Sequence, residues 1–510
     1  MRGLLLLSAG LSAACLAERG PFTNRMAQSG TSYLARAARQ PVNWQPWGRD
    51  AFALASRLDR PILLYVGNDA CHWCVETDRA IYTDPEIGAL INALFVPVRV
   101  DRDERPDVAQ RYQVAVERLA GLHGWPLTVF LTADGSPFFG GTYFPADDPI
   151  TGRGLKQLLP EIAKRYRDQR PFIAQQAAVV RQFMLTSEGE SRGVLRASLV
   201  TDGIARVKRE LDAAVQAGMT GNSVVHVEAV SLLLTEYARS RDTAALAVAR
   251  GALALMLDTA NVAAGDDAPR LVRAALVAAL AQGWIVTADP RYRESGREFV
   301  NALAPVLATR EVFADQQAFI LENTMLAAAT LDVPAVEKSA RAALDLLLQR
   351  AYAKGWGVRH LVTDAQPLSG TMPPGLLQDQ VQVASACLAA HQLTGDKRYL
   401  DVAVDLAAIL ESRYADSMGG YYDVVESPGS AQPSSPTVLG DRTKHVLDDV
   451  LPGANPAAAR FLARLSTVTE DRTYRRRAHA ALEAFAGSIP DAGLRAATFL
   501  AAARETLGAP

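Results

Sequence analysis

The sequence predicts an α/β domain followed by an all-α domain. Short apolar runs typical of strands alternate with helical segments up to about Tyr166. From about Leu155 onward helical periodicity dominates almost to the end of the chain, without a convincing strand run. A chain of 510 residues is long enough for two domains. We therefore place the α/β domain in residues 22–190 and the helical domain in residues 195–510.

The strands and helices of the first domain come in a recognisable order. The predicted strands are Ile62–Val66, Phe95–Val100, Leu127–Leu131 and Ser136–Thr142. Asp107–Arg118 is helical, and Ala133–Gly135 is a turn signal, so the last strand returns antiparallel to the one before it. This order predicts a thioredoxin-like fold with an N-terminal extension.

Cys71-His72-Trp73-Cys74 lies between the first predicted strand and helix-compatible sequence. A CxxC between a strand and a helix is typical of a thioredoxin-type redox site. The helix start supplies unpaired N–H groups and a partial positive charge, which favour a thiolate at Cys71. Because the thiolate is the nucleophile, Cys71 is the predicted attacking thiol. Cys74, one turn later, is positioned to resolve a mixed disulfide.

Other side chains complete the predicted site. His72 is expected to stabilise the Cys71 thiolate, or else to be an exposed helix-start residue without a partner. Trp73 and Trp125 are expected to contact the substrate protein. Pro126, just before the third strand, is predicted to form a cis peptide bond facing the CxxC, with an ordinary trans proline as the alternative. Asp101 either relays protons or belongs to a solvated run of charges.

Zinc is the main rival use of a CxxC. The four cysteines are Cys15, Cys71, Cys74 and Cys387, and no second CxxC or HxxxH completes the roughly four ligands that a structural zinc site needs. We therefore expect no metal and no cofactor. Cys387 lies in an Ala/Val-rich helical run and is expected to be a buried small hydrophobe.

The N-terminus is predicted to be an export signal in residues 1–17. Arg2 precedes an apolar stretch, 3–16, that is too short to span a bilayer. Cleavage after Ala17 is one outcome; lipidation of Cys15 is disfavoured because Leu11 lies one place too far upstream. A disordered or helical tail is the alternative. Export, expected to be to the periplasm, would bring the CxxC into an oxidising compartment. No later segment is expected to span a membrane.

Charge gives no indication of nucleic-acid binding. The net charge is −2, and the lysines and arginines are scattered apart from Arg475–Arg477 on a predicted helix. The expected partners are protein disulfides or dithiols, and the sequence leaves the oligomeric state open.

The second domain is predicted to contain about a dozen helices joined by mostly short loops. Short loops produce antiparallel pairs, and six pairs can close into an (α/α)6 toroid; an open solenoid is the alternative. Two longer loops, 354–375 and 418–436, are rich in glycine or proline. The predicted helices are Ile204–Ala217, Val227–Tyr237, Thr243–Leu257, Pro269–Gln282, Pro290–Ala304, Ala318–Leu331, Val336–Leu348, Asp379–Leu393, Arg398–Ser412, Asn455–Leu465, Asp471–Ala486 and Ala492–Thr506.

Several segments together resemble a known family, the thioredoxin-domain proteins of the spermatogenesis-associated-protein-twenty type. The matching segments are Thr31–Leu34, Pro41–Trp47, Cys71–Thr77, Val100–Asp107 and His123–Pro145. The resemblance covers about Tyr33 to Tyr166. It implies a thioredoxin-like domain joined to a toroid similar to six-hairpin glycosidases and sugar epimerases.

This chain departs from the family pattern at three places. The histidine after the family's CHWC is Val75 here. The family loops that usually read PKFP and PHFEKML appear as Val224–Val227 and Ala268–Val272. In the relatives these loops would line the toroid mouth, so their loss weakens a role in sugar chemistry.

A sugar-acting toroid would need two carboxylates about 5–10 Å apart across a cleft. The candidate cleft residues are Asp379, Asp448, Trp356 and His360, with Glu228, Asp449 and His226 also considered. The plain alternatives are that Asp379 caps its helix and that His226 and Glu228 are ordinary helix-start residues.

The sequence thus favours a thiol–disulfide oxidoreductase that acts on protein disulfides through its CxxC, with the helical toroid positioning the partner. A carbohydrate-binding or sugar-acting toroid with an accessory thioredoxin-like domain is one alternative. A non-catalytic binding scaffold with a redox-sensitive conformation is the other.

Overall fold

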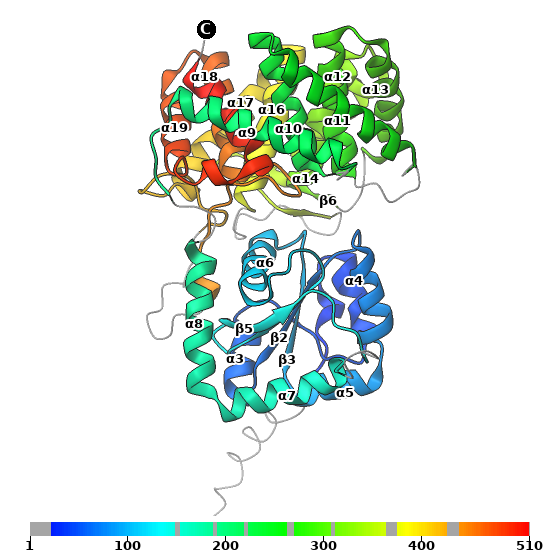
Figure 1. Cartoon of the computed structure of the whole chain (residues 1–510), viewed down its shortest axis with the longest axis vertical. Coiled ribbons are helices and arrows are strands. Elements are labelled where there is room, and N and C mark those ends of the chain that lie inside the picture. The colour runs from blue at the N-terminus through cyan, green and yellow to red at the C-terminus, as the bar shows by residue number, and fades with distance from the viewer. Residues whose placement is uncertain are drawn as a thin grey trace, which may run out of the picture. The chain divides into compact units, whose positions relative to one another are not determined.

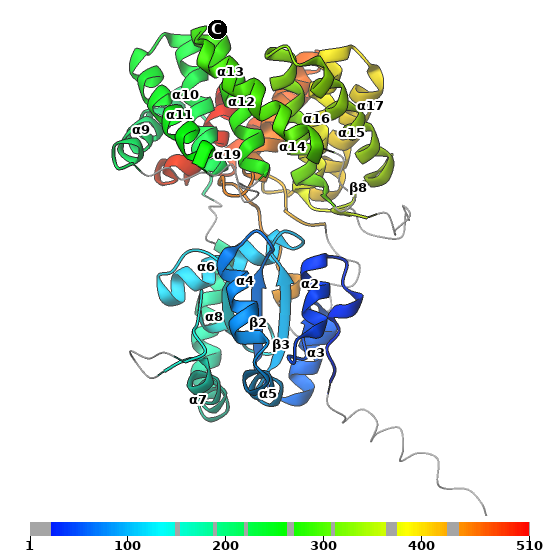
Figure 2. The same cartoon turned by 90° about the vertical axis from the view of Figure 1, so that its right-hand side faces the viewer.

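The structure is a computed structural model that describes residues 22–147, 153–186, 191–218, 223–262, 270–307, 312–363, 375–425 and 438–508. It forms two compact units: the first takes the described residues up to Arg181 together with Val438 and Leu439, and the second takes the other described residues (Figures 1 and 2). The predicted export signal and Cys15 lie outside the described residues.

The first unit contains a five-stranded mixed sheet. Its strands are β1 (Gln45–Pro46), β2 (Ile62–Gly67), β3 (Val96–Asp101), β4 (Leu127–Leu131) and β5 (Pro137–Gly141), in the order β1-β3-β2-β4-β5. β3 is parallel to β1 and β2, whereas β4 is antiparallel to β2 and β5. The four strands predicted from the apolar runs are confirmed, including the antiparallel return of the last.

Helices lie on both faces of this sheet (Figure 2). They are α2 (Ser32–Arg36), α3 (Arg49–Leu58), α4 (His72–Thr77), α5 (Pro85–Leu94), α6 (Pro106–Ala120), α7 (Leu155–Asp168) and α8 (Arg170–Thr186). Every residue of β2, β3 and β4 is buried, as expected of continuous apolar runs covered on both sides. The predicted thioredoxin-like α/β fold is therefore confirmed.

The strand register brings the predicted redox residues to one edge of the sheet. Gly67, the last residue of β2, is paired with Asp101, the last residue of β3. Val66 is paired with Leu127, so Pro126 stands at the same edge, immediately before β4. The loop that leaves β2 at this edge leads directly to Cys71. Ligand and active sites of open α/β sheets lie at such carboxyl-terminal strand edges.

The second unit is a closed double ring of helices. Its elements are α9 (Ala197–Gln216), α10 (Val224–Ser240), α11 (Thr243–Val262), α12 (Arg270–Thr287), α13 (Pro290–Leu303), α14 (Ala314–Thr330), α15 (Pro334–Ala351), α16 (Leu377–Thr394), α17 (Lys397–Ile409), α18 (Ala454–Thr469), α19 (Arg472–Glu483) and α20 (Ala497–Leu507). The even-numbered helices contact one another in sequence, and α20 returns to contact α10. The odd-numbered helices pack outside them. This closure confirms the (α/α)6 toroid and excludes the open solenoid.

Two details of this unit differ from the sequence expectation. Four two-residue strands occur where none was expected: β6 (Val312–Phe313) pairs with β9 (Leu361–Val362), and β7 (Tyr352–Ala353) pairs with β8 (Gly357–Val358). In addition, α12 is long and apolar enough to span a membrane by length and composition. It is half buried and packs against α10, α13 and α14, so its apolar character is accounted for by its place in the inner ring.

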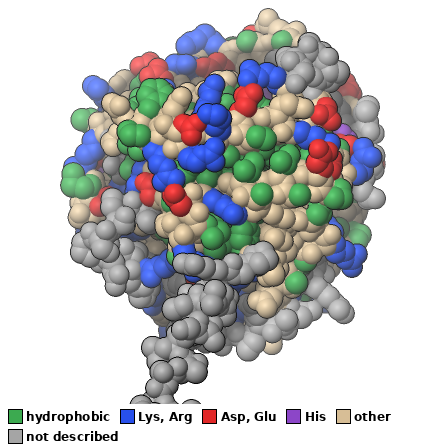
Figure 3. All heavy atoms as spheres, turned by 90° about the horizontal axis from the view of Figure 1, so that it is seen from below, with side chains coloured by type: hydrophobic (Ala, Val, Ile, Leu, Met, Phe, Trp, Pro, Cys, Tyr) green, Lys and Arg blue, Asp and Glu red, His purple; other side chains and the backbone are tan. Residues whose placement is uncertain are grey.

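Charged side chains are intermixed on the surface face drawn in Figure 3. Basic and acidic groups alternate there with apolar ones, in keeping with the net charge of −2.

Candidate redox site

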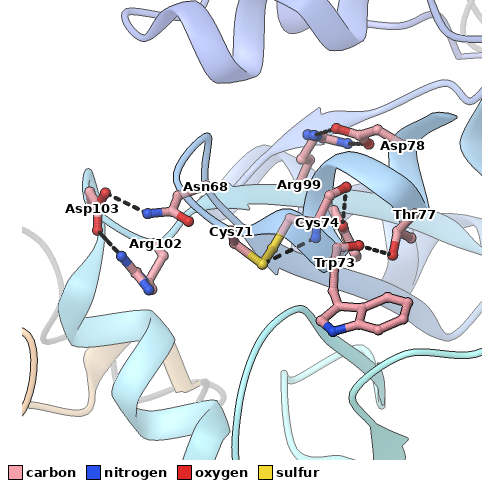
Figure 4. Close-up of a disulfide and its surroundings, with 10 residues drawn as sticks. Asn68, Cys71, Trp73, Cys74, Thr77, Asp78, Arg99, Arg102 and Asp103 are labelled. Carbon is pink, nitrogen blue, oxygen red and sulfur yellow. Dashed lines mark hydrogen bonds and ion pairs between the residues drawn. A yellow bond between two sulfur atoms is a disulfide. The ribbon is translucent and has the colours of Figure 1, made fainter. Parts of the chain in front are cut away.

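Cys71 and Cys74 form a disulfide at the start of α4. Cys71 is the N-cap of this helix and is partly exposed, whereas Cys74 is fully buried. The backbone N–H of Cys74 donates a hydrogen bond of 3.1 Å to Cys71 Sγ (Figure 4). The same N–H can stabilise a thiolate at Cys71, as a helix N-terminus does. The two sulfurs thus have the accessibility expected of an attacking and a resolving thiol.

Exposed aromatic side chains lie within and next to the CxxC segment. His72 is exposed, and its ring lies edge-on to that of Trp73, with centroids 5.6 Å apart. The Trp73 ring is 55% exposed and lies 5.4 Å from the ring of Tyr143. Val75, at the position of the family's histidine, is also exposed. These side chains give Cys71 an apolar rim that suits contact with a protein chain.

The Trp125–Pro126 peptide bond is cis, as predicted. Pro126 is buried directly before β4. Trp125 is half-buried, and the Arg102 guanidinium lies 5.5 Å above its ring. Arg102 is in turn bound to Asp103, which accepts a hydrogen bond of 2.8 Å from Asn68 in the loop before the CxxC (Figure 4).

An ion pair joins the buried Arg99 to the partly exposed Asp78, the residue that follows α4. Arg99 on β3 is 1% exposed and forms two hydrogen bonds, of 2.7 and 2.6 Å, to the Asp78 carboxylate (Figure 4). The rings of Tyr33, Trp44 and Tyr65 enclose the guanidinium, with centroids 4.3, 5.6 and 5.1 Å from it. Burial alone would lower the pKa of Arg99, but Tyr33 and Asp78 outweigh burial and raise it. Sequence reasoning missed this pair because its members lie far apart in the chain.

Asp101 is buried at the edge of the sheet, opposite Gly67. Burial, together with the nearby Asp103 carboxylate, raises its pKa to about 6, against hydrogen bonds from the Asp103 amide and the Thr31 hydroxyl. A carboxyl with this pKa can take up and release protons near neutral pH. Asp101 is therefore not part of a solvated run of charges, and its role as a proton relay stays a prediction.

The toroid candidates Asp379 and Asp448 are both fully buried. Asp379 Oδ2 accepts a hydrogen bond of 2.6 Å from the amide of Leu376, which agrees with the helix-cap alternative. Asp448 accepts 2.9 Å hydrogen bonds from the amides of Gly453 and Thr498. In this structure both carboxylates accept hydrogen bonds from backbone amides in the interior and do not face a substrate.

His360 contacts Asp379, whereas Trp356 lies half-exposed in the turn between β7 and β8. His360 Nδ1 is 2.8 Å from Asp379 Oδ1 and 3.8 Å from Asp315 Oδ1. The ligand atoms of Asp315, His360 and Asp379 lie within 4.8 Å of one another, so among the described residues this group could hold a metal ion. Sequence reasoning missed Asp315, which shares no local motif with the other two.

The inner ring also carries a charged cluster. Glu505 on α20 accepts hydrogen bonds from Arg460 (2.9 Å) and Arg464 (3.1 Å) on α18, and Arg464 lies 3.7 Å from Glu322 on α14. Burial raises the pKa of Glu228 on α10 to about 7. The cluster links four helices around the ring. Cys387, on α16, is buried as expected, and burial raises its pKa.

Comparison with known proteins supports the assignment of the first unit. A thioredoxin-like family model, described as "Protein of unknown function, DUF255", matches residues 23–185. Spermatogenesis-associated protein 20 of Rattus norvegicus is 41% identical over 147 residues, which are 29% of this chain and 19% of that protein. An uncharacterized protein of Caenorhabditis elegans, B0495.5, is 37% identical over 159 residues, 31% of this chain and 22% of that one. The matched region thus spans about one fifth of these relatives.

Among solved structures, D-mannose isomerase aligns with a TM-score of 0.43 and 10% identity over 56% of this chain and 86% of that chain. Unsaturated glucuronyl hydrolase from Bacillus sp. GL1 aligns with a TM-score of 0.41 and 14% identity over 56% and 83%. At these identities the likenesses say nothing about what this chain binds.

Proposed function

We propose that this protein is a thiol–disulfide oxidoreductase that acts on protein disulfides, exported to an oxidising compartment, with its helical toroid positioning the partner. One observation carries the proposal: a partly exposed cysteine at a helix N-terminus is joined to a fully buried one. A substrate disulfide can reach Cys71 but not Cys74. Cys74 therefore reacts only after Cys71 has formed the mixed disulfide.

The reaction uses two thiol exchanges. In the dithiol form, the Cys71 thiolate attacks a substrate disulfide; a mixed disulfide forms and one substrate thiolate leaves. Cys74, losing its proton, then attacks Cys71 Sγ, so the Cys71–Cys74 disulfide forms and the second substrate thiolate leaves. Two electrons pass from the protein dithiol to the substrate disulfide. The same steps in reverse oxidise a substrate dithiol.

The aromatic rim supports a protein substrate. Trp73, within the CxxC, and Tyr143, whose ring lies 5.4 Å from that of Trp73, are exposed, and exposed aromatic rings contribute strongly to protein contacts. A small thiol reagent would gain little from these side chains, so their removal should separate the two kinds of substrate.

Trapping with the full-length chain tests the proposal. Cys74→Ser leaves Cys71 able to form a mixed disulfide that cannot be resolved. We expect the reduced variant to capture a disulfide-bonded protein as an adduct that dithiothreitol releases, whereas the matched Cys71→Ser variant captures none. Wild-type protein should also reduce insulin disulfides with dithiothreitol as electron donor. The proposal fails if Cys74→Ser forms no adduct and wild type gives no reduction above the dithiothreitol background.

Two alternatives make different predictions in the same experiments. A redox-sensitive scaffold would bind a partner with different affinity in its disulfide and dithiol forms, without adducts in Cys74→Ser. A carbohydrate-acting toroid would bind a saccharide equally well in Cys71→Ser and lose that binding in Asp379→Ala. The buried, backbone-bound state of Asp379 favours the redox proposal over the second alternative.

A further inference from the structure

The hydroxyl of Tyr33 is a buried polar group that has no hydrogen-bond partner among the described residues in the disulfide form. Tyr33, on α2 in the N-terminal extension, is 3% exposed, and its hydroxyl oxygen is fully enclosed. Leaving such a donor unpaired costs about 1–3 kcal/mol, so an unpaired hydroxyl next to a reactive group calls for an explanation.

The hydroxyl oxygen and the sulfur of Cys74 lie at most 5.5 Å apart, because one point lies 2.5 Å from the first and 3.0 Å from the second. Gly67, at the end of β2, leaves a space that both groups border. A Cβ placed on Gly67 would lie 2.5 Å from Tyr33 Oη and 3.0 Å from Cys74 Sγ. Tyr33 Oη and Cys74 Sγ therefore lie on either side of the same small space in the interior, which stays open because Gly67 has no side chain.

The neighbours of Tyr33 hold it in this position. Thr31 caps α2 by accepting a hydrogen bond from the amide of Leu34, and Arg36 at the other end of the helix binds Asp69 in the loop before the CxxC. The Tyr33 ring packs against the Arg99 guanidinium, 4.3 Å from it. The Arg36–Asp69 contact therefore attaches the C-terminal end of α2 to the redox loop, and the Thr31 cap fixes the other end of the helix.

The chemistry of the pair differs between the two redox forms. Burial, assisted by nearby carboxylates, raises the pKa of Tyr33 well above its ordinary value, so the phenol keeps its proton and can donate. A disulfide sulfur is a poor acceptor. Reduction replaces it by a thiol that can ionise, and a thiolate is a strong acceptor for a buried O–H.

We propose that Tyr33 donates a hydrogen bond to Cys74 Sγ in the dithiol form and thereby shifts the thiol–disulfide equilibrium of this site toward the dithiol. A shift toward the dithiol makes the Cys71–Cys74 disulfide a stronger oxidant. The biological meaning of this inference rests on the proposed function. The hydrogen bond also stabilises the Cys74 thiolate that must form before the mixed disulfide is resolved.

Equilibration of the full-length protein with glutathione tests the shift directly. Two glutathione molecules supply the two electrons and two protons and leave as glutathione disulfide. At a pH above the Cys74 pKa, where the thiolate is the populated form, we expect Tyr33→Phe to raise the equilibrium constant for forming the Cys71–Cys74 disulfide about tenfold, which corresponds to a reduction potential lower by about 30 mV. The matched control is Tyr65→Phe, because the Tyr65 hydroxyl donates to the Cys74 carbonyl (3.3 Å) and not to the sulfur. Its equilibrium constant should stay within about twofold of wild type.

A second measurement reports the thiolate itself. In a Cys71→Ser background, the absorbance of the Cys74 thiolate at about 240 nm follows its titration, and Tyr33→Phe should raise the Cys74 pKa by about one unit. The inference is overturned if Tyr33→Phe, folded by circular dichroism, leaves both the equilibrium constant and this pKa unchanged. Because glutathione alone is the probe, a protein without activity on protein disulfides would refute the proposed function and leave this result standing.

Discussion

Gly67 offers a direct test of the packing around the resolving sulfur. A methyl group added there would lie 2.5 Å from Tyr33 Oη and 3.0 Å from Cys74 Sγ, well inside the 3.5–4.0 Å at which such atoms normally rest. Overpacking of this kind costs about 1–3 kcal/mol, and alanine recovers about 0.5–1 kcal/mol relative to glycine in a strand. We therefore expect Gly67→Ala to destabilise the first unit by about 1–2 kcal/mol.

The closest contact is with a single atom, so its removal should restore stability. Tyr33→Phe deletes that oxygen and also removes an unpaired donor, so by itself it should be neutral or slightly stabilising in the disulfide form. Combined with Gly67→Ala, it should recover about 1 kcal/mol of the loss, which a double-mutant cycle reports as coupling.

Urea unfolding of the full-length disulfide form measures these differences. Tryptophan fluorescence reports mainly on the first unit, because four of the six tryptophans precede residue 182. Gly88→Ala is the matched control: its methyl would lie 3.0 Å from Pro41, away from Tyr33, so Tyr33→Phe should not rescue it. Additive effects of Gly67→Ala and Tyr33→Phe would refute the geometry described above and weaken the proposed role of Tyr33.

Three further changes test other parts of the first unit. Asp101→Asn should remove one pH-dependent contribution to stability. The pKa of about 6 lies above the unfolded value, so the contribution of Asp101 is fully present below about pH 4 and falls by up to about 3 kcal/mol as the pH rises through 6. The difference in unfolding free energy between wild type and variant, measured by urea titration across this range, should change by that amount. Asp78→Ala should cost about 3 kcal/mol by leaving the Arg99 guanidinium buried and unpaired, and adding Arg99→Met should restore most of it; equal losses in the single and double variants would contradict the pairing. Trp73→Ser should slow insulin reduction severalfold without changing the glutathione equilibrium; equal rates on insulin would show that the exposed ring is not part of substrate contact.

The fold could be predicted because its signals are local. The apolar runs of β2, β3 and β4 and the turn before β5 are each contained within a few residues, and the CxxC marks the start of α4 by itself. Ring closure required a choice between toroid and solenoid, because short loops specify antiparallel pairs but do not specify that α20 contacts α10.

The surroundings of the redox site were harder to predict because they depend on distant pairings. Nothing local marks Arg99 as the partner of Asp78, or Tyr33 as the neighbour of Cys74, since α2, α4 and β3 are separated along the chain. The charge of Asp101 was visible in the sequence, but its burial follows only from the β2–β3 register. In the toroid, Asp379 and Asp448 are buried and bind backbone amides. Their residue type alone is equally compatible with a place in an open cleft.

The contact between α10 and α20 has a consequence for biosynthesis. On the ribosome α10 emerges early, yet the surface that covers its flank belongs to a helix translated long afterwards. During that interval the apolar side of α10 stays open to water, and a chaperone that shields hydrophobic segments would have its longest opportunity there.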